Sequence, residues 1–77
     1  MKRFMLWGEI RWLNRGDETN FLSIPKEKAL FTMAESEGEA RKNFQVRILL
    51  GIKQRSPRNY PLRHHDVLLD YANLVAL

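Results

Sequence analysis

AESEGEARKNFQVRILLG, residues 34–51, is the stretch with the clearest helix pattern in the 77-residue chain. Ser36 and Glu39 form the S-x-x-E pattern of a capping box, in which two side chains satisfy backbone N–H groups at a helix start. Glutamates crowd this start, where the helix dipole favours negative charge. Gly51 is placed to end the helix as a left-handed cap. Apolar residues at four-residue spacing predict one broad buried face: Ala40, Phe44, Ile48 and Ile52.

A sheet is predicted on the N-terminal side of this helix. Residues 3–13 alternate with period two, as a half-buried strand does. Residues 14–18 have turn chemistry, and residues 19–24 return as an antiparallel strand that Pro25 ends. Residues 29–33 form a short third strand or continue the second. The two faces of the first strand are Phe4, Leu6, Gly8, Ile10 and Trp12 on one side, and Arg3, Met5, Trp7, Glu9 and Arg11 on the other.

The chain after the helix begins with a basic segment, residues 53–65, which Pro57 and Pro61 mark as loop. Residues 66–77 fit either a helix or a strand, and a strand at residues 67–71 is preferred because it completes a sheet face. The last few residues are expected to fray. The predicted architecture is a single α+β domain over residues 1–77, a small antiparallel sheet of about three or four strands with one helix packed across it. The first helical turn leaves one alternative, in which Thr32 is the cap and Glu35 completes its box.

The composition indicates a small globular protein of a reducing compartment. Apolar residues make up 44% of the chain, enough for one small core, and cysteine is absent. The apolar start of the chain resembles a signal peptide, but Glu9 and Arg11 interrupt it early, and they also argue against a membrane span. The sequence therefore predicts a cytoplasmic protein with no membrane partner, in the host cytoplasm if a phage encodes it.

The charge is uneven, and this asymmetry is the main functional signal. The chain carries a net charge of +4, and residues 53–65 contain no acid. An anionic partner is expected there, either a nucleic acid or an acidic protein surface. The ordinary alternative is a loop that only keeps a small protein soluble. The candidate partner-binding residues are Lys53, Arg55, Arg58, Tyr60 and Arg63, with Trp7 as an exposed aromatic unless the C-terminal segment covers it.

Catalytic, metal and cofactor sites are not predicted. His64 and His65 are adjacent, so on a strand they point opposite ways, and no other His or any Cys completes a metal site. None of the serines has a spacing that nominates a base for nucleophilic catalysis. A chain of this length is also expected to lack a pocket of several hundred cubic ångströms, so no small-molecule substrate is predicted. The expectation is a non-enzymatic protein without a cofactor.

The step from strand to helix also carries a family resemblance. The segment Ala34-Glu35-Ser36-Glu37-Gly38-Glu39-Ala40, with the predicted element order, resembles small phage-encoded proteins that shut off host transcription by binding RNA polymerase. The resemblance implies a compact protein that occludes a surface of a larger machine or displaces a factor from it, and it assigns no binding residue. The expected function is therefore regulation of transcription through a protein partner, with RNA polymerase favoured. The alternative is RNA or DNA binding through residues 53–65.

Overall fold

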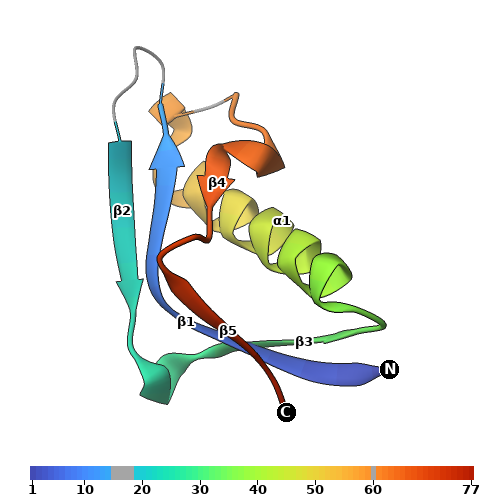
Figure 1. The fold of residues 1–77 in the computed structure, drawn as a ribbon. Helices are drawn as coiled ribbons and strands as arrows, with labels where there is room; N and C mark the ends of the chain where they lie inside the picture. The colour runs from blue at the N-terminus through green and yellow to red at the C-terminus, as the bar shows by residue number, and fades with distance from the viewer. Residues whose placement is uncertain (15–18, 60) are drawn as a thin grey trace.

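A computed structural model describes residues 1–14, 19–59 and 61–77 of the chain. Over these residues the chain forms a five-stranded antiparallel sheet with one α-helix, α1 (Glu37–Arg55), packed on one face (Figure 1). The predicted α+β class is confirmed, with five strands because the C-terminal segment supplies two. The strands are β1 (Lys2–Leu13), β2 (Thr19–Ile24), β3 (Leu30–Ala34), β4 (Val67–Leu68) and β5 (Ala72–Ala76).

The long strand β1 is the centre of the sheet, and each of its edges carries two shorter strands. Gly8 lies opposite both Ile24 of β2 and Ala72 of β5, so β2 and β5 flank opposite edges. By the same reasoning, the two pairings of Leu6 place β3 on the same edge of β1 as β2. The two pairings of Arg11 place β4 on the same edge of β1 as β5. The sheet is therefore about three strands wide along both halves of β1.

Strand β1 bends sharply between its two halves, and α1 lies on the inside of the bend (Figure 1). Gly8 occupies the middle of β1 with φ of 106°, a conformation that residues with a side chain rarely adopt. A Cβ atom at Gly8 would lie 3.0 Å from Nδ2 of Asn73 and 3.3 Å from Cα of Ala72 in β5. Glycine thus allows both the backbone turn and the close approach of β5.

The core lies between the inner face of the sheet and α1. The helix buries Ala40, Phe44, Ile48 and Ile52, which confirms the face that their four-residue spacing predicts. The sheet contributes the even-numbered residues of β1, with Trp12 partly buried at the margin, so the predicted alternation is also confirmed. The sheet residues of the core are Phe4, Leu6, Ile10, Ala34 and Val67, and Leu69 joins them from the connection between β4 and β5.

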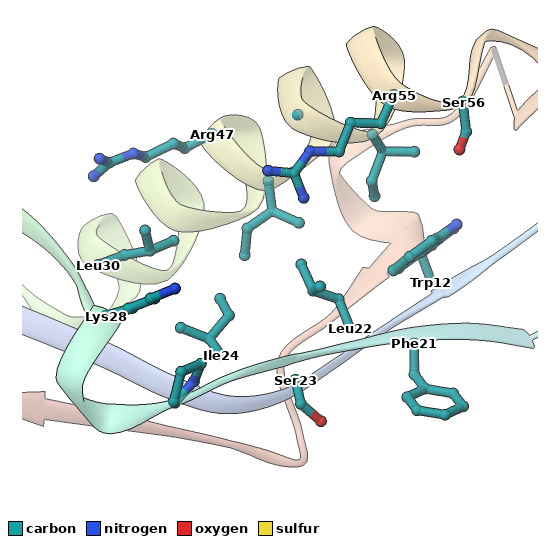
Figure 2. A pocket seen from close by; sticks show the side chains of 14 residues that line it. Trp12, Phe21, Leu22, Ser23, Ile24, Lys28, Leu30, Arg47, Arg55 and Ser56 are labelled. Atoms are coloured by element: carbon teal, nitrogen blue, oxygen red, sulfur yellow. The ribbon is translucent and has the colours of Figure 1, made fainter.

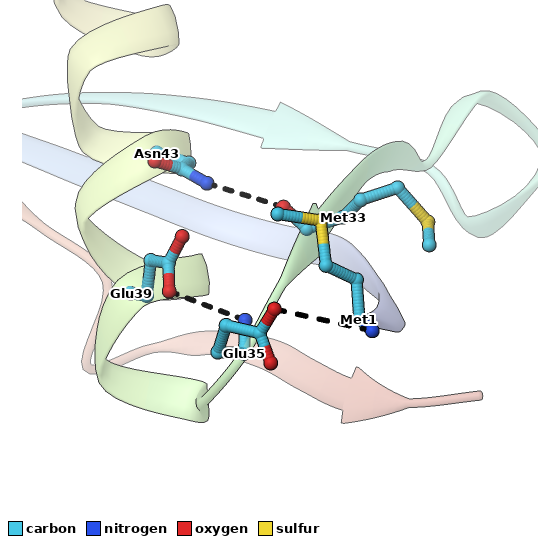
Figure 3. A network of polar contacts seen from close by, with 5 residues as sticks. All are labelled: Met1, Met33, Glu35, Glu39 and Asn43. Carbon is cyan, nitrogen blue, oxygen red and sulfur yellow. Dashed lines mark hydrogen bonds and ion pairs between the residues drawn. The ribbon is translucent and has the colours of Figure 1, made fainter.

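The helix begins as the capping pattern predicts, with one difference. Ser36 is the N-cap, and its Oγ accepts a hydrogen bond of 3.2 Å from the Glu39 N–H, which excludes Thr32 because Thr32 lies inside β3. The Glu39 carboxylate turns back to the N–H of Glu35 at 3.2 Å rather than to that of Ser36 (Figure 3). The Met1 amino group forms an ion pair with the Glu35 carboxylate at 4.0 Å, so the chain start lies beside the helix start (Figure 3).

The helix does not end at Gly51, as the sequence predicted, and the predicted loop does not begin at residue 53. The helix continues through Gly51 to Arg55, which brings Ile52 onto the buried face. Burial of Ile52 offsets the cost of a helical glycine, about 1 kcal/mol. The helix ends at Arg55, with Ser56 as its C-cap, because the residue before a proline is driven out of the α conformation and Pro57 follows Ser56. Short 3-10 helices then occupy Pro57–Asn59 and His64–Asp66.

The predicted strand at residues 67–71 is also wrong in extent. Strand β4 stops at Leu68, Asp70 and Tyr71 turn, and β5 starts at Ala72, whose N–H donates to the Leu69 carbonyl oxygen at 3.0 Å. The break occurs because β4 pairs with one half of β1 and β5 with the other half, across the bend. At the C-terminus, the Leu77 N–H donates to the Arg3 carbonyl oxygen at 2.8 Å.

Candidate functional site

Helix α1 leaves a groove beside β2. Among the strands, the helix packs chiefly against β3, β4 and β1. Its side chains also cover the outer edge of β3, where Arg47 donates to the Phe31 carbonyl oxygen at 2.9 Å and Asn43 lies 3.5 Å from that of Met33. Beside the C-terminal half of α1, a groove of about 660 Å³ opens toward β2 (Figure 2). The expectation that so short a chain lacks a cavity of this size is therefore wrong.

The floor of the groove is apolar. Leu22 and Ile24 point into it from β2, as Figure 2 shows, and both remain half-buried because α1 does not reach them. Gly51 faces it from the helix, and a Cβ atom there would meet no atom within 4 Å. The absence of a side chain at Gly51 thus leaves open space on the helix side of the groove. Its apolar lining comprises Trp12, Leu22, Ile24, Leu30, Ile48 and Ile52.

The backbone of β2 forms one wall of the groove. Residues 21–25 line it consecutively, although Phe21 and Ser23 point away from it (Figure 2). Because neighbouring side chains on a strand point to opposite faces, Phe21 and Ser23 line the groove through their backbone atoms, so the groove reaches the backbone of β2. Among the described strands β2 pairs only with β1, so its other edge presents backbone N–H and C=O groups that no strand occupies.

The rim of the groove is basic. Arg47 and Arg55 approach from α1 and Lys28 from the opposite side, and all three are exposed. The described residues that line the groove include no Asp or Glu. The potential at the mouth of the groove is therefore positive, above an apolar floor.

The structure places the predicted partner-binding residues in different locations. Lys53 and Arg55 are exposed in the last turn of α1, and Arg55 is the one member of the predicted set, among those that the structure describes, that lines the groove. Arg58 and Arg63 are exposed in the segment that follows α1. Tyr60 lies outside the described residues.

Trp7 is separate from all of these. It lies on the face of β1 away from the helix, half-buried, with the Lys26 ammonium 5.2 Å from its ring centroid. The structure therefore does not join Trp7 and the basic segment into one site.

Sequence reasoning missed most of the groove. Lys28 and Arg47 stand far apart in the sequence, and their approach depends on the angle at which α1 crosses the sheet. One signal was present: the alternation in residues 19–24 puts Leu22 and Ile24 on the core side, where a single helix cannot cover every strand.

Potential metal ligands do not gather in the described part of the chain. Its His, Asp and Glu side chains form no cluster of three or more that could hold a metal ion. The two histidine rings meet edge to face, 5.7 Å apart, and His65 Nε2 lies 3.5 Å from the Asp66 carboxylate. No helix in the described residues is long and apolar enough to cross a membrane.

Comparison with known proteins gives no match among family models, curated proteins or solved structures.

Proposed function

We propose that this chain is a non-catalytic regulatory domain that binds an extended, acidic segment of a partner protein in the groove beside β2. One observation carries the proposal: β2, whose outer edge pairs with no described strand, borders a groove with an apolar floor and a basic rim. The cysteine-free sequence supports action in the reducing cytoplasm.

Binding proceeds by strand addition. An extended peptide pairs its backbone with the outer edge of β2, and every second side chain enters the groove. Apolar side chains at those positions contact Leu22 and Ile24, while carboxylates at flanking positions meet Lys28 and Arg55. The basic rim also disfavours a second copy of this chain as the partner. In such a dimer two basic rims would face and repel each other, and each chain carries a net charge of +4.

RNA polymerase is the partner we propose to test first. The resemblance of residues 34–40 to phage-encoded polymerase inhibitors supports this choice. Occlusion is the mechanism: a segment held in the groove is unavailable to the factor that competes for it. Nucleic-acid binding by residues 53–65 is the second candidate, supported by the exposed Arg58 and Arg63.

A groove-filling variant tests the site without weakening the fold. Gly51→Leu replaces a poor helix former by a good one and projects its side chain into open space, so the melting temperature should stay level or rise. Binding of immobilised variant to purified, nuclease-treated RNA polymerase should fall about tenfold or more relative to wild type. A Gly51→Leu protein that is folded and binds as wild type would exclude the groove.

Charge variants separate the rim from the basic segment. Arg55→Gln should weaken binding to the polymerase, whereas Lys42→Gln, an equal charge change at an exposed helix position outside the groove, should not. The double variant Arg58→Gln, Arg63→Gln should also bind normally. If this double variant is the defective one, the segment after α1 is the interface, and loss of the signal on nuclease treatment would identify its partner as nucleic acid.

A further inference from the structure

The face of the sheet away from α1 carries exposed aromatic side chains along its length. Phe31 lies across from Met5 in the first half of β1, and Phe21 lies across from Arg11 in the second half. Tyr71, in the turn before β5, reaches the second half from the other edge of the sheet. The exposed fractions are 68% for Phe21, 41% for Phe31 and 56% for Tyr71. Rings this exposed contribute little to the core.

Cations accompany these rings. The Arg3 guanidinium carbon lies 4.5 Å from the ring centroid of Phe31, and that of Arg11 lies 3.8 Å from the ring centroid of Tyr71. Glu9 is an acid on this face of β1, and it is hydrogen-bonded to Arg11. That hydrogen bond raises the pKa of the Arg11 guanidinium, which therefore stays charged at every physiological pH.

We propose that this face binds a single-stranded polynucleotide. Unpaired bases stack on aromatic rings and on guanidinium planes, and phosphates are attracted to the accompanying cations. Each half of β1 presents an aromatic ring together with a guanidinium group, which is both a stacking plane and a positive charge. A duplex keeps its bases stacked inside and cannot use these rings, whereas a flexible single strand can follow the bend at Gly8.

A polynucleotide fits this face better than an apolar protein surface does. Each cation here would have to be buried against such a partner, and among the described residues of this face the ion pair is that of Arg11 with Glu9. Phosphates supply the countercharge directly. The rings lie on the other face of the sheet from α1 and the groove, and Phe21, which borders the groove, turns its side chain away from it (Figure 2).

Fluorescence anisotropy with labelled oligo(dT) and oligo(U) of about 15 nucleotides, the upper range for one small binding domain, tests the proposal. Wild type should bind, with an affinity that falls linearly with salt on a log–log plot. Phe31→Thr removes the aromatic ring but keeps a residue that favours strands. Arg11→Lys keeps the positive charge but removes the planar guanidinium group. Each should weaken binding about tenfold, the effect of losing one stacked base.

Controls identify the face. Gly51→Leu, which fills the groove, and Lys42→Gln, which removes a distant charge, should bind the oligonucleotides as wild type does. Equal binding by Phe31→Thr, Arg11→Lys and wild type would overturn the proposal and show only diffuse charge attraction. Absence of wild-type binding at low salt would also overturn it. If a protein co-purifies with wild type after nuclease treatment, but with neither Phe31→Thr nor Arg11→Lys, the face would be assigned to a protein partner. Circular dichroism establishes that each variant is folded.

Discussion

Phe44 is the residue on which the helix–sheet contact depends most directly. It is fully buried at the middle of the helix face, among the largest enclosed side chains of the core. Phe44→Ala should cost about 3–5 kcal/mol of unfolding free energy, a large share of the stability of a domain this small. Val46→Ala is the matched control, because Val46 is 47% exposed on the same helix and should change stability little. Urea titrations of both variants provide the measurement, and equal midpoints would contradict the assignment of the buried face.

The two tryptophans show what a sequence pattern reveals at the scale of a residue. Alternation in residues 3–13 separates Trp12 from Trp7, and the structure confirms that they occupy opposite faces. The same pattern places Arg3 and Arg11 on the face of Trp7. It cannot show that Phe31 and Tyr71 approach those arginines, because these rings come from elements whose pairing with β1 is set by the whole sheet.

Strand β1 is the element that sets the sheet geometry, through its bend at Gly8. Gly8→Ala should destabilise the protein by roughly 1–3 kcal/mol or more, because alanine is strained at φ of 106° and its methyl group would crowd Ala72. Gly38→Ala is the control within a helix: the nearest atom to a Cβ there is Ser36 Oγ at 3.9 Å, so stability should hold or rise. Thermal melts compare the two, and a Gly8→Ala protein as stable as wild type would mean that β1 does not need glycine at its bend.

Element ends were harder to predict than element faces, for physical reasons. The helix start is local, since Ser36 and Glu39 bond within one turn, and it was predictable. The helix end is not local, because Gly51 would stop an isolated helix but burial of Ile52 carries this one to Arg55. The division of the C-terminal segment into β4 and β5 likewise follows from the bend in β1. The groove depends on the angle at which α1 crosses the sheet, and the spacing of apolar residues in the sequence does not predict this angle.

The whole molecule presents two different surfaces on the two sides of one sheet. The helix side has the groove beside β2, with an apolar floor and a basic rim. The other side has rings and cations in pairs. One helix covers the inner face of the sheet and does not reach all of β2, so in the described part of the chain the outer face and the outer edge of β2 have no covering helix or strand.

The separation of these surfaces leads to a prediction for the intact protein. Gly51→Leu lies in the groove and Arg11→Lys on the outer face, and the two residues share no partner. Changes at separate sites add within about 0.5 kcal/mol, so the double variant should lose polymerase binding as Gly51→Leu does and oligonucleotide binding as Arg11→Lys does. Both affinities are measured for wild type, each single variant and the double variant, completing a cycle for each ligand. A coupling well above that limit would show that one surface controls the other through the bend at Gly8, and the two sites would then have to be treated as one.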